Sequence, residues 1–181
     1  FVWTSERSGY NHLYLYRMNG KLVRQITKGN WDLTHFYGVD PDGKTLYYQS
    51  AEESPLRRSV YRIDVKGRNK KRLSQKEGTN VAYFSANFSL FINQFSNANT
   101  PFDYALYSKD GKRVKDIVNN DQLKKTLSEL HIAPKEFFTF TTSEGVELNG
   151  WMIKPKDFDA TKKYPVFMTV YGGPGSQTVT D

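Results

Sequence analysis

A mainly β fold, built from antiparallel sheets that repeat along the chain, is predicted from two regularities in the first two thirds of the sequence. The pair Leu13-Tyr14 recurs 47 positions later as Val60-Tyr61, and Ile26-Thr27 recurs at the same spacing as Leu73-Ser74. Almost no segment there has the 3.6-residue period of an amphipathic helix. Four short strands in a period of about 45 residues are typical of a β-propeller blade.

Glycine-containing turns mark where each repeat folds back on itself. Asn19-Gly20 and Asp110-Gly111 are strong signals for two-residue hairpin turns, and Lys66-Gly67 is a weaker one. Gly111 follows Gly67 by 44 positions. A third copy of the hairpin is therefore expected between Tyr104 and Ile117-Val118.

Further strands are expected between these hairpins. They are Phe1 to Ser5, Phe36 to Val39, Thr45 to Gln49, Phe84 to Ala86 and Leu90 to Phe95, with a turn at Asp40-Pro41-Asp42-Gly43. A β-sandwich would explain such strands but not their period. Because propellers usually contain about 4 to 8 blades, these repeats cannot close a ring, and we expect the chain to be a piece of a larger protein.

A single helix is predicted after the third hairpin. Leu123, Leu127 and Leu130 follow the helical spacing i, i+4 and i+7, and Asn120 or Asp121 is a suitable N-cap. Pro134 is expected to end the helix after residues 131–133. We interpret this segment as a linker between domains, with its leucine stripe packed as structure.

The last fifty residues have a different pattern. Two strands, Glu136 to Thr141 and Val146 to Ile153, flank the turn at residues 142–145, and the loop Pro155 to Lys163 follows. Tyr164-Pro165 then opens a continuous apolar run to Val170, which is typical of a buried parallel strand. Its carboxyl end is where open α/β sheets place their sites.

The loop after this run, Tyr171-Gly172-Gly173-Pro174-Gly175-Ser176-Gln177, suits an oxyanion hole. Its glycines let the backbone approach a ligand, and Pro174 stiffens the turn. A tyrosine stands where an HGGG-type motif has histidine, and its phenol is a hydrogen-bond donor. The alternative is that Tyr171 caps a strand and that the glycines only turn the chain.

The Tyr164-Pro165 run and the tyrosine-glycine loop resemble the entry to the catalytic domain of the dipeptidyl peptidase IV branch of the prolyl oligopeptidase family of serine peptidases. Ile26 to Trp31 and Leu46-Tyr47-Tyr48 resemble the final blades of that family's propeller. The resemblance implies final β-propeller blades at 1–118, a helical linker at 119–134 and the N-terminal strands of an α/β-hydrolase domain at 135–181.

The resemblance also implies a function. It indicates a serine exopeptidase that releases dipeptides from peptide amino termini after proline or alanine, with Tyr171 donating to the oxyanion. No G-x-S-x-G elbow occurs in the sequence, so the nucleophile, acid and histidine of the triad are expected outside it, and the fragment alone is expected to be inactive. Glu52-Glu53 is not assigned to binding of the substrate's amino terminus.

Other functions stay open. A tripeptidyl or acylaminoacyl peptidase is the alternative within the family, and a propeller that only binds proteins is the alternative from another class. Extending the sequence by about 100 residues, the scale of the missing hydrolase portion, and looking for a G-x-S-x-G elbow would distinguish these functions.

Composition restricts the partners and cofactors. The net charge of +7 raises nucleic acid as a partner, but the densest positive stretch, Arg62 to Lys76, alternates with apolar residues as on the wet face of a sheet. There is no cysteine, and His12, His35 and His131 lie far apart, so no metal or other cofactor is expected.

No apolar run could span a membrane and no targeting segment is visible. The resemblance implies peptide substrates, a homodimeric parent and a periplasmic or secreted location.

Overall fold

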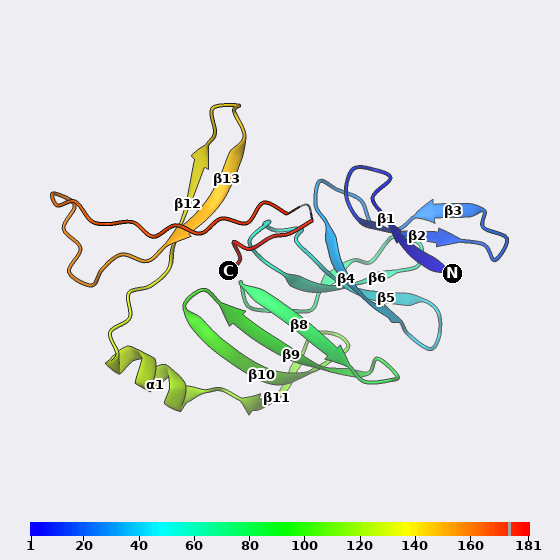
Figure 1. Ribbon diagram of the computed structural model, residues 1–181. Coiled ribbons are helices and arrows are strands. Elements are labelled where there is room, and N and C mark those ends of the chain that lie inside the picture. The colour runs from blue at the N-terminus through cyan, green and yellow to red at the C-terminus, as the bar shows by residue number, and fades with distance from the viewer. Residues whose placement is uncertain (174) are drawn as a thin grey trace.

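The computed structural model describes residues 1–173 and 175–181, and it confirms a mainly β fold. Three antiparallel sheets follow one another along the chain, and each is made of strands that are neighbours in sequence (Figure 1). A helix and a separate two-stranded sheet come after them. The repeated sheets match successive propeller blades.

Each repeat contributes one sheet whose strands pair in chain order. The first sheet contains β1 (Val2–Ser5), β2 (His12–Tyr16) and β3 (Leu22–Gln25). The second contains β4 (Leu33–Val39), β5 (Thr45–Ser50), β6 (Ser59–Asp64) and β7 (Lys71–Arg72). The third contains β8 (Thr79–Phe84), β9 (Leu90–Asn97), β10 (Thr100–Ser108) and β11 (Arg113–Val118). Helix α1 (Asp121–Glu129) and the pair β12 (Glu136–Thr141) and β13 (Glu147–Met152) complete the elements.

Two apolar clusters pack the sheets face to face. Strand β5 serves both, because its side chains alternate: Leu46 and Tyr48 face the first sheet, and Tyr47 faces the third. Full burial of such a side chain contributes about 1.5–3 kcal/mol. Arg62 of β6 was expected on a wet face, but its guanidinium pairs with Asp110 of the third sheet at 2.6 Å. The charge therefore lies at the rim between two sheets.

The hairpins lie where the sequence predicts them, but their loops are longer than predicted. In each, a glycine N–H closes a four-residue turn and the strands rejoin one residue later, so three residues form the loop. Of these residues only the glycine has a positive φ, +81° at Gly20 and +78° at Gly67. A two-residue type I′ turn needs positive φ at both central positions, whereas a type I turn followed by a left-handed glycine needs only one.

Two of these glycines also lie close to the backbone of the preceding sheet. A Cβ added at Gly67 would lie 2.8 Å from the carbonyl oxygen of Ile26, and one added at Gly111 would lie 2.9 Å from that of Leu73. The hairpin of each sheet therefore sits against the end of the preceding sheet's hairpin. A side chain at either position would push the two sheets apart.

One strand of the third sheet is displaced from its predicted place. The sequence predicts a strand from Phe84 to Ala86, but β8 ends at Phe84 and a turn follows, in which Phe88 has φ +56°. The strand also begins earlier than expected, at Thr79, and Asn80 donates its N–H to the carbonyl of Arg58, just before β6, at 2.9 Å. The whole strand pairs with β9, and the bond to Arg58 adds a contact with the second sheet that the local pattern does not contain.

Helix α1 is present but shorter and more exposed than predicted. It ends at Glu129, before Pro134, because His131 adopts a left-handed conformation with φ +50°. Asn120 precedes the helix without capping it and donates its side-chain amide to the carbonyl of Phe102 instead. No helix residue is buried, so the expected packing of the leucine stripe is wrong for this structure.

Within the described residues, no helix is long and apolar enough to cross a membrane. The same residues contain no group of three or more His, Asp or Glu side chains placed to hold a metal ion.

Candidate active site

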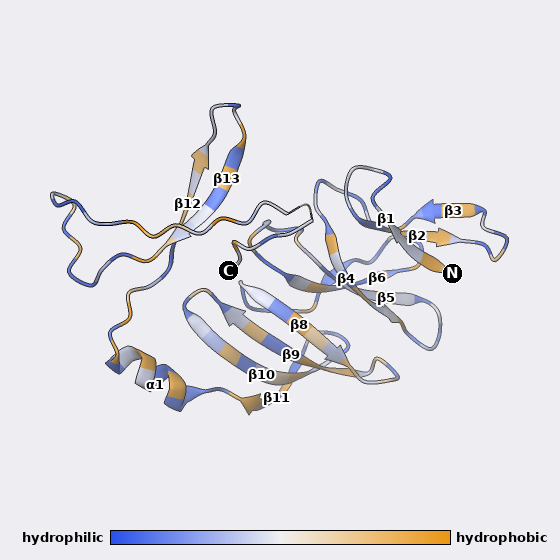
Figure 2. Cartoon of the chain, viewed as in Figure 1, coloured by the Kyte–Doolittle hydropathy of each residue, from blue (hydrophilic) through white to orange (hydrophobic). Residues whose placement is uncertain are grey.

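The segment that leads to Tyr171 is not a strand in this structure, which corrects the prediction of a buried parallel strand. Residues 165–170 have no ladder partner among the described residues, and Phe167 is 94% exposed. Apart from Thr169 the run consists of apolar residues, and Figure 2 shows orange stretches in this tail, by which we mean residues 165–181. A strand needs a neighbour to accept its backbone hydrogen bonds, and β12 and β13 pair only with each other.

The loop before this run is held by local contacts. The Tyr164 hydroxyl accepts the N–H of Asp159 at 2.8 Å, and its ring stacks on Phe158. The Asp159 carboxylate accepts hydrogen bonds from the hydroxyl and from the N–H of Thr161. These bonds, the hydroxyl bond more than the N–H bond, hold the pKa of Asp159 below its usual range. The chain therefore enters the apolar run from a defined turn.

Tyr171 itself lies on the surface and is 66% exposed. A Cβ added at Gly173 would lie 2.7 Å from the Tyr171 hydroxyl and equally close to its ring. The phenol therefore rests directly over Gly173, and a side chain there would displace it. An exposed phenol can donate a hydrogen bond to a developing negative charge. Pro174, expected to stiffen this turn, lies outside the described residues.

The far end of the tail is tied to the second and third sheets through Asp181. Its N–H donates to the Leu56 carbonyl at 2.7 Å, and its carboxylate accepts the Ala98 N–H at 3.0 Å. The Arg57 guanidinium lies 3.4 Å from the same carboxylate. Figure 1 shows this end of the chain beside β8. Arg57 and Asp181 are 124 positions apart, and no sequence pattern indicated their contact.

Arg57 belongs to a region where cations are partly buried. Burial lowers the pKa of the neighbouring Arg58 guanidinium, and the Asp32 charge partly offsets this. Arg58 donates to the carbonyls of Pro55 and Arg57, which holds the loop before β6 in shape. Arg57 also pairs with Glu77 at 2.8 Å, so two carboxylates orient one guanidinium.

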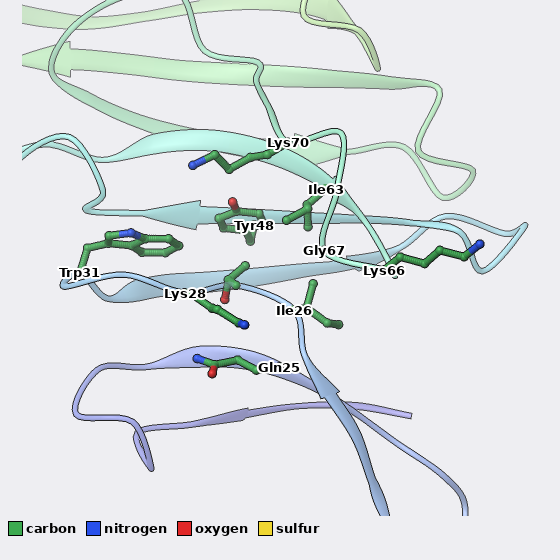
Figure 3. A pocket seen from close by; sticks show the side chains of 10 residues that line it. Gln25, Ile26, Lys28, Trp31, Tyr48, Ile63, Lys66, Gly67 and Lys70 are labelled. Carbon is green, nitrogen blue, oxygen red and sulfur yellow. The ribbon is translucent and has the colours of Figure 1, made fainter.

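A cavity of about 330 Å³ lies between the first two sheets, away from Tyr171 (Figure 3). Trp31 and Tyr48 line it with parallel rings, and Lys28, Lys66 and Lys70 also contribute to its walls. The charges do not converge: Lys66 extends away from the aromatic pair in Figure 3, and Lys70 is paired with Glu52. The cavity therefore lacks the arrangement expected of an anion site.

The acidic pair Glu52-Glu53 is used inside the second sheet. Glu53 accepts hydrogen bonds from Tyr61 at 3.0 Å and Ser59 at 3.2 Å, and it pairs with Arg72 at 2.9 Å. Burial, followed by the charge of Glu53, raises the pKa of the Tyr61 hydroxyl. These contacts give Glu53 a structural role.

His12 is likewise structural. It is buried between the Thr27 hydroxyl at 3.1 Å and the Gly29 carbonyl at 3.0 Å. Because a carbonyl only accepts, Nε2 carries the proton and Nδ1 accepts from Thr27. Both ring nitrogens are therefore occupied within the first sheet.

Consecutive sheets of this kind, each formed from one sequence repeat, define a β-propeller protein. Residues 1–102 match the family described as the dipeptidyl peptidase IV (DPP IV) N-terminal region. The chain belongs to this dipeptidyl peptidase IV family.

Individual relatives agree over the whole chain. It is 34% identical to dipeptidyl peptidase 4 of Arthroderma otae and 33% identical to that of Trichophyton rubrum, in each case over 99% of this chain and 24% of the relative. The crystal structure of Porphyromonas gingivalis dipeptidyl peptidase 4 matches with a TM-score of 0.94 and 47% identity, over 100% of this chain and 26% of that one. The chain thus spans about a quarter of the length of these relatives.

Proposed function

We propose that this chain is part of a serine exopeptidase that releases N-terminal dipeptides, Xaa-Pro or Xaa-Ala, from peptides. Residues 1–118 supply the final propeller blades, 119–134 the linker and 135–181 the start of an α/β-hydrolase domain. The observation that carries the proposal is the match to a dipeptidyl peptidase 4 structure over the entire chain at 47% identity, including the Tyr171 loop.

The exposed apolar tail supports the hydrolase part of this proposal. Val166, Phe167, Met168 and Val170 are each at least 80% exposed. Soluble proteins rarely leave such a continuous apolar run in water, because burying it is worth roughly 25 cal/mol per Å². In the full-length enzyme, further chain covers this run.

Tyr171 has a defined role in the proposed mechanism. A serine outside this chain attacks the scissile carbonyl while a histidine accepts its proton, and negative charge develops on the carbonyl oxygen. The Tyr171 phenol donates one hydrogen bond to that oxygen, together with a backbone N–H beside the serine. Gly173 supports this role, because its missing Cβ leaves room for the phenol.

The test is Tyr171→Phe in the full-length enzyme. This change keeps the ring over Gly173 and deletes the donor, so kcat should fall by about a hundred-fold or more while KM changes little. Both constants are measured on one Xaa-Pro substrate, with circular dichroism as the check on folding. Tyr83→Phe is the matched control, since this exposed phenol bonds to Gln94 within the third sheet. An unchanged kcat in the Tyr171 variant would refute the role.

Two alternatives predict other results. A tripeptidyl or acylaminoacyl peptidase would prefer substrates with three residues or a blocked amino terminus before the cleaved bond, so rates on matched peptides separate them. A propeller that only binds proteins would lack a G-x-S-x-G elbow in the residues that follow and would cleave none of these substrates.

The assembly is proposed from the family resemblance alone. The full-length enzyme is a homodimer, and light scattering after size-exclusion chromatography should give twice the monomer mass. A monomer mass at micromolar concentration would contradict this.

A further inference from the structure

We infer that Asp181 is a positioning residue for Tyr171, which it holds in place by fastening the tail of the chain to two propeller blades at once. This inference rests on the proposed oxyanion role of Tyr171. Its basis is the set of contacts that Asp181 makes far from its own position in sequence.

Asp181 bonds to both sheets with its backbone and its side chain. On the second sheet, the Leu56 carbonyl accepts its N–H at 2.7 Å and Arg57 pairs with its carboxylate at 3.4 Å. On the third sheet, the Thr79 hydroxyl donates to its carbonyl oxygen and the Ala98 N–H donates to its carboxylate at 3.0 Å. One residue thus bridges the space between adjacent blades.

The position of the Asp181 carboxylate suits it to fasten the chain to both sheets. Its side chain is 17% exposed, and each oxygen has a different donor, the Ala98 N–H on Oδ1 and the Arg57 guanidinium on Oδ2. Charge-assisted bonds of this kind are roughly twice as strong as neutral ones. Glu77 contacts Arg57 on its other side at 2.8 Å, with a side chain that is 66% exposed.

The rest of the tail has no comparable attachment. Among the hydrogen bonds of its described residues, 165–173 and 175–181, those that reach the earlier chain all involve Asp181. The others are local, such as Ser176 N–H to Gly173 and the Gln177 amide to Val179. Tyr171 therefore lies between two fixed points, the turn at Tyr164 and the anchor at Asp181.

Catalysis would be sensitive to this anchor. An oxyanion donor acts from about 2.7–3.1 Å, and a displacement of 1 Å can cost roughly a hundred-fold in rate. Releasing the far end of the loop would spread the positions of the phenol without removing it. Such a change lowers kcat and leaves the binding of the ground-state substrate nearly unaltered.

The experiment uses the full-length enzyme and a set of matched variants. Asp181→Asn keeps an oxygen for the Ala98 N–H and removes the charge facing Arg57, while Arg57→Gln removes the charge from the other side. Each should lower kcat by about ten-fold or more with KM within about two-fold. Arg57→Lys, which retains the charge, should recover much of the loss. Arg68→Gln is the control, because it removes a guanidinium from the separate ion pair with Asp64, and it should leave kcat unchanged.

A double mutant separates positioning from general structural damage. If Asp181 acts through the phenol, adding Asp181→Asn to Tyr171→Phe should lower kcat no further, because the donor is already absent. Independent, multiplying losses, or a parallel rise in KM, would overturn the inference. A normal kcat in Asp181→Asn would do the same while leaving the Tyr171 role intact. If Tyr171→Phe alone has no effect, the proposed oxyanion role of Tyr171 is refuted, and the positioning role of Asp181 is refuted with it.

Discussion

The side-chain hydroxyl of Thr27 accepts the backbone N–H of Leu13 at 2.9 Å, while the Leu13 carbonyl accepts the N–H of Ile26 at 2.7 Å. The same arrangement joins Ser74 to Val60, at 3.1 Å for the hydroxyl bond. In both sheets a hydroxyl therefore replaces the next backbone carbonyl of the ladder. This explains why the sequence repeat preserves a hydroxyl residue 14 positions after Leu13 and 14 positions after Val60.

Removing this hydroxyl should leave a buried donor without a partner. Thr27→Val keeps the shape of the side chain, and the unsatisfied Leu13 N–H should cost about 1–3 kcal/mol. Hydrogen exchange at the Leu13 amide should accelerate by roughly ten-fold or more, while amides of the third sheet keep their rates. Thr27→Ser retains the hydroxyl and serves as the control. Equal exchange in both variants would contradict the assignment.

Replacing Gly67 tests the contact between neighbouring sheets. Gly67→Ala places a methyl group 2.8 Å from the Ile26 carbonyl oxygen, in addition to the left-handed strain of about 1–2 kcal/mol. Gly43→Ala carries similar strain at φ +67° but meets nothing within 4 Å. Urea denaturation should therefore show a larger loss of stability for Gly67→Ala. If the two variants unfold at the same midpoint, the close approach is not rigid.

Buried tyrosines should make the fold sensitive to alkali. Burial raises the pKa of Tyr37 to about 12, and the Ala82 N–H, which donates to its hydroxyl, partly offsets this. Burial also raises the pKa values of Tyr47, Tyr48, Tyr61 and Tyr107. Because these folded-state values exceed the usual value of about 10, the stability they provide is complete below pH 10 and is lost as pH rises through them.

Absorbance titration checks this expectation. A group of tyrosines should ionise late, together with the loss of the circular dichroism signal, whereas in denaturant all should ionise near pH 10. Tyr37→Phe should remove one member of the late group. Simultaneous ionisation of every tyrosine near pH 10 in the folded protein would show that these hydroxyls are not buried.

The 181 residues alone should not hydrolyse Gly-Pro or Ala-Pro chromogenic substrates. The reason is that an oxyanion donor accelerates a reaction only when a nucleophile is present, and the sequence contains no G-x-S-x-G elbow. The measurement is release of the chromophore by the purified chain, with the full-length enzyme as the positive control. Turnover that persists through repeated purification would contradict the proposed division of the active site.

The β-hairpins were predictable because the information for them is local. Alternation at Tyr61 and Ile63, a glycine at position 67 and a hydroxyl at position 74 each act within one repeat, and the structure places them accordingly. The third repeat lacks this hydroxyl residue, and its strand pairing differs at the same place. It has Val118 where the others have a hydroxyl, and there the ladder continues, with Tyr104 paired to Val118.

The errors arose where distant parts of the chain decide the outcome. The run 165–170 has the composition of a strand, yet a strand forms only beside a partner, and the described residues provide none. The start of β8 is bonded to Arg58, next to another sheet, and the anchor at Asp181 joins residues 124 positions apart. The Tyr171 loop was identified by its residues, but the contact proposed to hold it has no local signal.

Each sheet contains only strands that are adjacent in sequence, and this affects the order in which the chain folds during synthesis. Within each sheet a strand pairs only with the strand just before or after it, so a blade can form once its own forty or so residues have left the ribosome. The bond between Arg57 and Asp181 cannot form until the whole span between them has been synthesised. Blades would therefore be complete before the tail docks on them, and synthesis would reach the proposed active-site loop only after its support has folded.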